Sequence, residues 1–443
     1  MDPDPTVPRE PGAGGRSVTP EDLEDALVDG DREVRRGTAR AALQYPMFRR
    51  VWLGALASNI GSWMQNVVLG ALVFQLTGSA VWVSAVTFAQ LGPLLLLSIV
   101  GGTLADIFDR RRLIIGVAVE QGLFSLLLAW IVTADEPSVV AIVAVVGCIG
   151  IGQAIHAPTF TSVTPSLVER PDLPGAVSLQ SANLNASRVV GPAIGGVLYA
   201  SVGASWVFVL NALTYAFIII AMWPLTIPPA PPTAGDRGMA RLLGGFRAAR
   251  ADPVIARCLL TMTAFSLFCL PFVAQMPTVA QTNFGIDPES ATYGALYAAF
   301  GAGALLGALS IGTVFAGSSL ARIARLGLAA ISVTLAAFAL TRTPAPAFPI
   351  AVLLGFAYFS TVTSLSSVVQ QRVSEAERGR VMALWIMSFG GTVPIGALIA
   401  GPLIEATSIT DVMLFGAVMA AVLAWWCDLR AAAGGVEPVA LSG

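Results

Sequence analysis

The sequence predicts an all-helical membrane protein with twelve spanning helices in two similar halves of six. Of the 443 residues, 55% are hydrophobic and only 12% are charged, whereas soluble domains carry about 25% charged residues. Apolar runs recur along the chain, each close to the roughly 20 residues that a helix needs to cross a bilayer. The charged residues collect between these runs, as expected for a chain that crosses a membrane many times.

The loops between the apolar segments sort by charge when they are assigned alternately to the two sides of a membrane. From a cytoplasmic start, the inner loops are rich in arginine, whereas the outer loops hold acidic residues and Arg342 as the single basic one. Basic loops mark the cytoplasmic side, and one missed helix would scramble this sorting. We therefore expect both termini in the cytoplasm. The predicted spans are 50–75, 80–105, 112–134, 138–165, 176–202, 204–226, 254–282, 291–316, 320–342, 346–371, 379–404 and 410–430.

An internal repeat relates the two halves. The glycine-rich stretch 191–196 matches 396–401 at an offset of 205 residues, and the same offset aligns Gly150 with Gly355. Repeated helical halves are typical of secondary transporters. The predicted organisation is a disordered cytoplasmic tail at 1–44, a first six-helix half at 45–226, a cytoplasmic linker at 227–252, a second half at 253–430 and a cytoplasmic tail at 431–443.

The sequence lacks the residue patterns that enzymes and metal sites need. Its four cysteines are scattered without a paired spacing, and His156 is the single histidine. A disulfide framework and a histidine-based metal site or triad are thereby disfavoured, and no nucleophile–base pair is evident. We expect no enzymatic activity, no metal, no cofactor and no nucleic-acid partner, and we expect a monomer.

A short charged turn joins the second and third predicted spans. Gly102, Asp106 and Arg110 recur every four residues and so share one helical face, and Arg111 and Arg112 continue the basic run. Such a face can hold an ion pair against a neighbouring helix and release it when the helices move. A fixed positive-inside anchor is the alternative. The second half lacks this acidic–basic pattern, so a latch would act from the first half alone.

The fifth predicted span carries a polar face. Gln180, Asn183, Ser187 and Arg188 fall on it at helical spacing, with Arg188 near the middle of the membrane. A charge at that depth costs about 3 kcal/mol on insertion scales, so Arg188 must face water, a carboxylate or a substrate. One hypothesis is a structural bond, for example to Glu120. The other is a cavity-lining charge that attracts an anionic or acceptor-rich substrate.

A glycine–proline motif follows on the same span, formed by Gly191, Pro192, Gly195 and Gly196. Proline removes a helix hydrogen bond and bends the helix, while the glycines allow a neighbouring helix to approach closely. The motif resembles one in the fifth helix of major facilitator exporters, and that resemblance implies that it shapes the interface between the two halves. Plain packing of small residues is the alternative.

Polar side chains within the apolar spans define candidate cavity and proton sites. Glu120 is the one carboxylate clearly within a predicted span, so it is the leading protonation candidate, although a structural pairing is the alternative. Asp106 and His156 are further protonation candidates. We expect an amphiphilic, aromatic-lined cavity, although each residue alone also fits ordinary packing. Besides Arg188, Asn183 and Gln180, the cavity candidates are Asn59, Gln65, Gln153, Gln275, Tyr297 and Tyr358.

Several phrases between positions 45 and 430 carry a resemblance to a known family. They are 46–52, 74–79, 101–112, 150–154, 157–158, 167–168 and 185–192. Together they resemble the enterobactin-exporter-like (transmembrane secretion effector) branch of the major facilitator superfamily. In the charged turn, Asp109 stands where the family pattern has glycine, and the family's earlier glycines in the fifth span are replaced by Ser178 and Ser187.

The resemblance implies the major facilitator fold and proton-driven export of a small amphiphile, such as a siderophore, an antibiotic or a drug, by alternating access. It implies a bacterial inner (cytoplasmic) membrane as the location, with the lipid bilayer and a small-molecule cargo as partners and the proton gradient as the energy source. It does not identify the cargo. An importer or facilitator of the same fold, and a non-transporting membrane scaffold or sensor, are the alternative functions.

Overall fold

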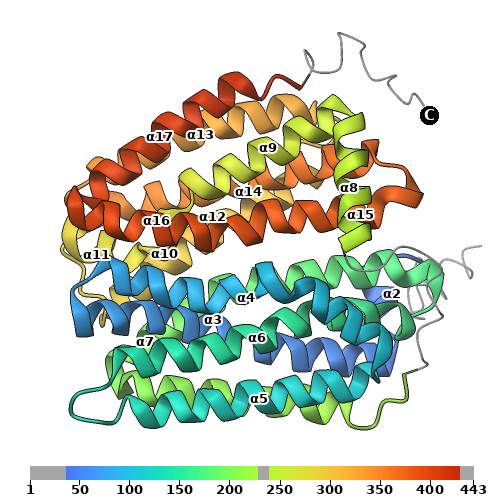
Figure 1. Ribbon diagram of the computed structural model, residues 1–443, viewed down its shortest axis with the longest axis horizontal. Coiled ribbons are helices and arrows are strands. Elements are labelled where there is room, and N and C mark those ends of the chain that lie inside the picture. The colour runs from blue at the N-terminus through green and yellow to red at the C-terminus, as the bar shows by residue number, and fades with distance from the viewer. Residues whose placement is uncertain (1–35, 228–238, 430–443) are drawn as a thin grey trace, which may run out of the picture.

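The computed structural model describes residues 36–227 and 239–429, which fold into helices without a strand. These helices form two bundles that lie side by side (Figure 1). The first bundle comprises α2 (Ala39–Leu43), α3 (Pro46–Thr77), α4 (Ala80–Ile107), α5 (Arg110–Ile131), α6 (Val139–Val163), the short turns η1 (Thr164–Ser166) and η2 (Arg170–Asp172), and α7 (Leu173–Met222).

The second bundle follows α8 (Met239–Ala251), which crosses beside α15 in Figure 1. It comprises α9 (Pro253–Phe268), α10 (Pro271–Ala274), α11 (Met276–Phe284), α12 (Ala291–Gly312), α13 (Leu320–Leu340), α14 (Pro344–Arg372), α15 (Glu375–Ile386), the π-helical turn η3 (Met387–Gly391), α16 (Thr392–Ala406) and α17 (Ile409–Trp426). Helices α2 and α8 lie toward the same end of the molecule, on the right of Figure 1. We call this the terminal end and the opposite one the loop end.

Within the described ranges, nine helical stretches are long and apolar enough to cross a membrane. One of them, Arg170–Met222, contains the predicted span 176–202 and most of the predicted span 204–226, which are joined without a loop. Gly203 separates them at a φ of 83°, a backbone conformation that glycine adopts without steric cost. No atom lies within 4 Å of the place where a Cβ would stand there, so the backbone angle alone favours glycine. The total of twelve spans stays a prediction.

The predicted continuous span 254–282 is wrong in one respect, because the helix breaks twice. It divides into α9, α10 and α11, and prolines stand in the first turns of α10 and α11. Proline has no N–H and collides with the preceding turn, so Pro271 and Pro277 cannot continue a regular helix. The second break places Gln275 between two short helices, where its side chain can reach out of the bundle.

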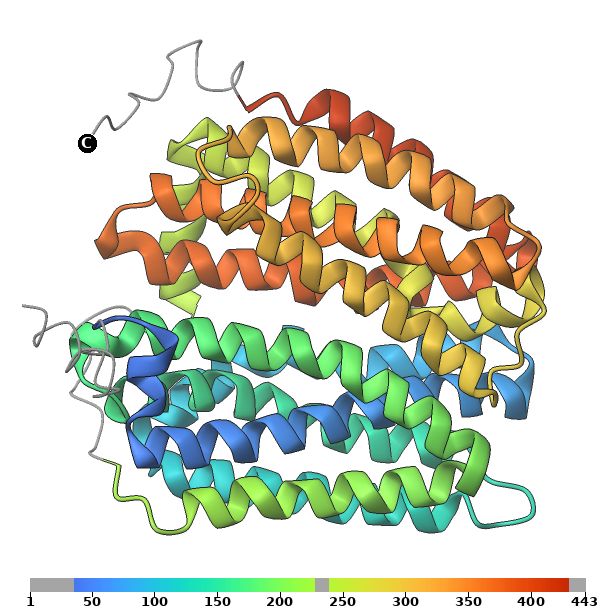
Figure 2. The same ribbon diagram turned by 180° about the vertical axis from the view of Figure 1, so that it is seen from behind.

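The two bundles meet along two seams, α7 with α12 and α4 with α16. Seen from behind, α12 lies along the first part of α7 (Figure 2). A Cβ on Gly196 would lie 2.5 Å from the Cα of Gly294, and one on Gly401 would lie 2.6 Å from Ser84 Oγ. Lipid tails are as apolar as the side chains, so close packing of small residues is what drives such helices together.

The close glycine contacts of the seams lie from the middle of the helices toward the loop end, whereas the side-chain bonds that the structure describes at the terminal end stay within a bundle. Gly196 and Gly401 lie in the parts of α7 and α16 that are nearer the loop end. Gly301 packs on the Arg188 carbonyl, nearer the middle of the helices. At the terminal end, the described bonds of Arg36 reach Glu169 and Asp172 of the first bundle. Those of Arg372 and Arg257 reach Asp252 and the carbonyl of Asp428, next to the second bundle.

Candidate functional site

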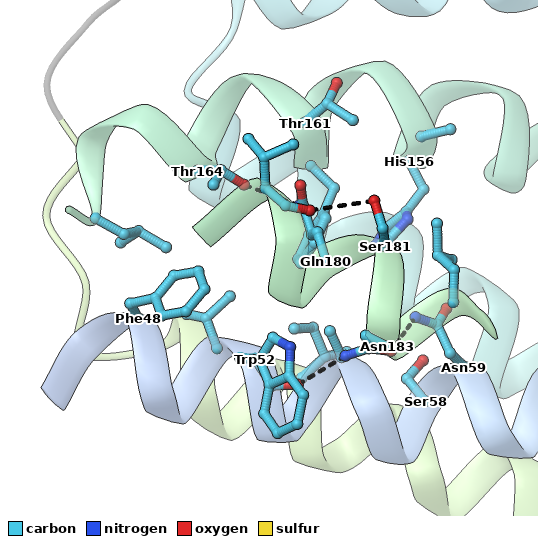
Figure 3. Close-up of a pocket in the computed structure, with 18 of the residues that line it drawn as sticks. Phe48, Trp52, Ser58, Asn59, His156, Thr161, Thr164, Gln180, Ser181 and Asn183 are labelled. Carbon is cyan, nitrogen blue, oxygen red and sulfur yellow. Dashed lines mark hydrogen bonds between the residues drawn. The ribbon is translucent and has the colours of Figure 1, made fainter. Parts of the chain in front are cut away.

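A pocket of about 230 Å³ lies between α3, α6 and α7 of the first bundle. Figure 3 shows amide, hydroxyl and aromatic side chains around it. Four of the predicted cavity residues line it together, and the predicted protonation candidate His156 joins them. These five residues are Asn59, Gln153, His156, Gln180 and Asn183. Of the polar face predicted on the fifth span, Gln180 and Asn183 line this pocket, whereas Ser187 and Arg188 do not, and α3 and α6 supply the other walls.

Hydrogen bonds between α3 and α7 fix the amides of this wall. Asn183 is buried; its Nδ2 donates to the Trp52 carbonyl at 3.0 Å and its Oδ1 accepts from Asn59 Nδ2 at 2.9 Å. Trp52 Nε1 donates to the Leu179 carbonyl at 2.8 Å. In Figure 3, Asn59 and Asn183 lie next to each other below Gln180. Because two of these bonds tie a side chain to the backbone and the third joins the two asparagines, the amides are held in place before a ligand arrives.

The α6 wall joins an aromatic surface to a polar one. The His156 ring stacks on Phe160 with centroids 5.4 Å apart. One turn earlier, Gln153 Oε1 accepts a hydrogen bond from Gln121 Nε2 of α5 at 3.1 Å. Gln180 Nε2 donates to Thr164 Oγ1 at 2.8 Å. An apolar ligand body with a few polar groups fits such a lining, because most of the wall is carbon and the amides supply fixed donors and acceptors.

Arg188 lies one helical turn beyond the pocket residue Leu184, where the two bundles meet. Its guanidinium stands over the Trp63 ring of α3 at 5.4 Å and over the Phe359 ring of α14 at 4.8 Å. Its hydrogen bond to Asn185 Oδ1 is long, at 3.4 Å. Cation–π contacts of this kind stabilise a desolvated guanidinium by about 0.5–2 kcal/mol each. We call Arg188, Trp63 and Phe359 the ring cage.

The ring cage leaves the positive charge without a counter-ion in the described part of the chain. No carboxylate there forms an ion pair with Arg188, so the structural bond to Glu120 that the sequence allowed is not formed. Tyr358 is stacked on Phe300 at 5.9 Å, and Tyr297 contacts the same ring edge-on at 6.5 Å. These two predicted cavity tyrosines therefore belong to the aromatic surroundings of Arg188, not to the pocket wall.

Glu120 occupies a niche made by a glycine. Its Oε2 is buried and has no hydrogen-bond partner among the described residues. A Cβ on Gly152 of α6 would lie 2.1 Å from this oxygen, so any larger residue at 152 would displace the carboxylate. Gln121, the next residue, bonds to the pocket residue Gln153. The intramembrane carboxyl thus lies close behind the pocket.

Two predicted cavity residues lie elsewhere. Gln65 is buried and accepts from Asn211 Nδ2 at 2.8 Å inside the first bundle. Gln275 is fully buried in the α4–α16 seam, where its Nε2 donates to the Ala80 carbonyl at 2.9 Å and to Ser84 Oγ at 2.8 Å. Both were selected as polar residues in apolar spans, and that pattern does not distinguish a cavity from a satisfied hydrogen-bond pair.

The charged turn is described in part. Gly102 and Asp106 lie in α4, and their side-chain surroundings are outside what the structure describes, so the latch stays a prediction. Arg110 Nη1 donates to the Ser162 carbonyl at 3.2 Å, and Arg111 donates to the Trp223 carbonyl. The beginning of α5 is therefore tied to α6 and α7 of its own bundle.

The departure from the family pattern in this turn has a local cause. Asp109 is the N-cap of α5, and its Oδ1 accepts from the Arg112 backbone N–H at 3.1 Å. A carboxylate at this position satisfies a free N–H and faces the positive end of the helix dipole. Glycine lacks this side-chain acceptor, so the aspartate gives the helix a defined start.

The glycine–proline motif divides between two interfaces. Cβ atoms on Gly191 and Gly195 would lie 2.5 Å from Trp63 Cβ and 2.9 Å from Met64 Cγ, so these glycines pack α7 on α3 within the first bundle. Gly196 alone of the motif's glycines faces the other bundle.

A buried carboxylate at the terminal end was missed by the sequence reasoning. Asp172 is 2% exposed, and it accepts from the Gly37 backbone N–H at 2.8 Å, from Tyr45 Oη at 2.9 Å and from Arg36 Nη1 at 3.0 Å. The Gly37 bond, followed by those from Tyr45 and Arg36, holds the pKa of the Asp172 carboxyl below its usual range. Its partners lie about 130 residues earlier in the sequence, so no local pattern could have paired them.

Two helical bundles meet along glycine seams, a polar pocket lies within the first bundle, and Arg188 near the junction has no ion-pair partner among the described residues. Two similar helical halves of this kind are typical of membrane transporters. A family described as transmembrane secretion effector matches residues 37–435. The chain belongs to this family of the major facilitator superfamily, and it is a multi-pass membrane transporter, not an enzyme.

Named relatives agree with this assignment. The enterobactin exporter EntS of Shigella boydii serotype 18 (strain CDC 3083-94 / BS512) is 28% identical over 370 residues, which are 81% of this chain and 85% of that protein. EntS of Escherichia coli O1:K1 / APEC is 28% identical over 370 residues with the same coverage.

Solved structures share the fold at low sequence identity. A mutant of the nucleoside transporter NupG is 14% identical with a TM-score of 0.71, covering 88% of this chain and 100% of that one. A bacterial homologue of the iron transporter ferroportin in an inward-facing state is 16% identical with a TM-score of 0.66, covering 86% of this chain and 99% of that one.

Proposed function

We propose that the protein exports a small amphiphile of the siderophore type from a bacterial cytoplasm. The observation that carries the proposal is the pocket of fixed amides and aromatic rings, with Arg188, which has no ion-pair partner among the described residues, one helical turn beyond the lining residue Leu184. Its similarity to proteins named enterobactin exporters supports a siderophore as cargo. Such a cargo combines aromatic surface with many oxygen acceptors.

The orientation belongs to the same proposal. Arginine-rich loops favour the cytoplasm, which puts both chain ends inside an inner membrane. Since the bundles meet toward the loop end, the state described here would face the cytoplasm. Cargo would then enter at the terminal end, past Phe48 and Thr164 at that side of the pocket.

Binding would couple the two bundles through the ring cage. A ligand that lies along the pocket can bond to Asn59, Gln153 and Asn183 while an anionic or acceptor group reaches Arg188. Because Trp63 and Phe359 belong to different bundles, a ligand at Arg188 touches both. Rocking of the bundles about this point would then carry the cargo to the other side.

A proton gradient is the proposed energy source, without any cofactor, in a monomer that has no nucleic-acid partner. Glu120 is the proposed proton site, since an intramembrane carboxyl without a partner readily exchanges a proton. Asp106 with Arg110 and Arg111 would close the cytoplasmic side when the cavity faces outward.

Everted membrane vesicles test the function and its direction. Respiration acidifies their interior, so a proton-coupled exporter should accumulate added enterobactin inside and release protons outward. Vesicles without the protein are the control, and nigericin, which collapses the pH gradient, should abolish the accumulation. Loss of enterobactin from preloaded vesicles against its gradient would indicate an importer. Equilibration that ignores nigericin would indicate a facilitator, and no movement at all would favour a scaffold or sensor.

A further inference from the structure

The first turn of α4 is held by three parts of the second bundle. Helix α4 begins after its N-cap Ser79, at the loop end. Glu405 at the end of α16, Gln275 at the break between α10 and α11, and Gly401 of α16 all contact residues 79–84. None of these contacts involves the pocket or the ring cage.

Glu405 binds the positive end of α4. Its Oε1 accepts a short hydrogen bond from Ser79 Oγ and a second one from the Val81 backbone N–H at 3.3 Å. The first N–H groups of a helix have no partner within it, and the helix dipole favours a negative charge beside them. A carboxylate from the opposite bundle therefore takes the place that a capping residue usually fills.

Gln275 holds the same turn from its buried side. Its Nε2 donates to the Ala80 carbonyl and to Ser84 Oγ, while its Oε1 accepts from Thr278 Oγ1 at 2.8 Å. Both Gln275 and Ser84 are fully buried. Parting of the bundles here would leave these groups without partners until water replaced them, and an unpaired buried polar group is costly.

The internal repeat makes this arrangement one-sided. At the offset of 205 residues, Gly401 corresponds to Gly196 and Glu405 corresponds to Ala200. Gly196 packs on Gly294 near the beginning of α12 just as Gly401 packs near the beginning of α4. The α7–α12 seam therefore has the glycine contact without the carboxylate, and among the described residues the side-chain hydrogen bonds between the bundles lie at the α4–α16 seam.

We propose that Glu405 and Gln275 form a clasp on the first turn of α4 that keeps the loop end closed and sets how often it opens. The clasp works at two depths. The exposed Glu405 can exchange its bonds for water quickly, whereas the buried Gln275 releases the turn only once the seam parts. The proposal concerns the balance between two conformations and does not depend on the cargo or on the proton site.

Spin-label distances across the loop end measure this balance. Glu136 and Thr343 are exposed residues of opposite bundles outside the clasp, and both would be changed to cysteine and labelled. Cys148, the one native cysteine that is not buried, would be replaced by alanine. Pulsed dipolar spectroscopy of the purified full chain in lipid nanodiscs then gives the ratio of long to short distances.

Both clasp variants should shift this ratio toward the open state. Glu405→Ala and Gln275→Met, the latter of nearly equal volume, should each raise the ratio of long to short distances about three- to tenfold, which corresponds to about 0.7–1.4 kcal/mol. Asp411→Asn is the matched control, because Asp411 is an exposed acid at the same end whose described bonds go to Ser408 of its own bundle. The control should leave the distances unchanged.

Hydrogen–deuterium exchange provides a second reading without labels. The Val81 amide donates to Glu405, so its exchange should become several-fold faster in Glu405→Ala and not in Asp411→Asn. Distance distributions and Val81 exchange that match the wild type in both clasp variants would overturn the proposal. So would an equal response in Asp411→Asn, because the effect would then be general loosening of the loop end.

Discussion

Arg188 is the residue on which the proposed cargo binding depends most directly. Its charge sits between Trp63 and Phe359 near the junction of the bundles, with no carboxylate in the described chain to neutralise it. A guanidinium in that position costs free energy unless something supplies negative charge or acceptors. Trp63 and Phe359 keep the Arg188 side chain oriented in the absence of a ligand, so ligand binding costs less side-chain conformational entropy.

Replacing Arg188 should weaken export strongly. A hydrogen bond to a charged group contributes about 1.5–3 kcal/mol, so Arg188→Ala should lower enterobactin accumulation in everted vesicles by about ten- to a hundredfold. Arg188→Lys should fall between, because lysine keeps the charge and loses the flat face that stacks on both rings. Arg322→Ala, an exposed arginine of the second bundle, serves as the control. Unchanged accumulation in Arg188→Ala would remove Arg188 from the binding site.

Gly152 is the residue that positions the proposed proton site. Gly152→Ala should displace the Glu120 carboxylate, since a Cβ there would lie 2.1 Å from Oε2, and proton release coupled to enterobactin uptake should drop about tenfold. Gly147→Ala on the same helix is the control, because its nearest neighbour would be 4.0 Å away. The added change Glu120→Asp shortens the side chain and should restore part of the coupling. If Gly152→Ala couples protons as well as Gly147→Ala does, the niche has no role in transport.

Polar residues in apolar segments could be recognised from the sequence, but their partners could not. Asn59, Gln153, Gln180 and Asn183 were selected on the same grounds as Gln275 and meet in one pocket, whereas Gln275 lies in a seam. The difference arises because a proline break turns Gln275 toward α4. Pairings between the bundles depend on the final packing, which no local pattern contains.

At the scale of helices, breaks and starts are explained by single residues. Gly203 separates two spans without a loop, Pro271 and Pro277 divide a third, and Asp109 begins α5. The sequence pattern placed the break between positions 202 and 204 correctly. It missed the breaks at the prolines, because the hydrophobicity continues unchanged through them.

The segment from Arg36 to Tyr45 should respond to acid through Asp172. The pKa of the Asp172 carboxyl is held low in the folded state. Its bonds therefore stabilise the folded segment fully above the unfolded pKa of about 4. This stabilisation is lost as the pH falls through the lower pKa of the folded state. Limited trypsin cleavage after Arg40 at pH 7.5 should be faster in Asp172→Asn than in the wild type. In the wild type, amide exchange of Gly37 should accelerate more than its intrinsic pH dependence requires as the pH falls from about 5 to about 3. In Asp172→Asn, Gly37 exchange should follow the intrinsic pH dependence alone. The same acid response in both proteins would show that Asp172 does not hold the segment.

At the scale of the whole molecule, two features are separated in space. The pocket and the ring cage lie in and beside the first bundle, whereas the clasp closes the loop end. The fold and the division into similar halves were predictable, because apolar length, arginine distribution and the repeat are properties of the whole chain. Which conformation the bundles adopt was not, because contacts between the bundles, such as that of Glu405 with Ser79, join residues 326 positions apart in the sequence.

The most direct test of the proposed export is to locate the cargo in the molecule. Electron cryomicroscopy of the full chain in nanodiscs, saturated with iron-free enterobactin, should reveal density that extends from Asn183 and Gln153 to the Arg188 guanidinium, with the loop end still closed. Enterobactin density at saturation that lies outside the pocket, with the ring cage unchanged and empty, would contradict the proposed export.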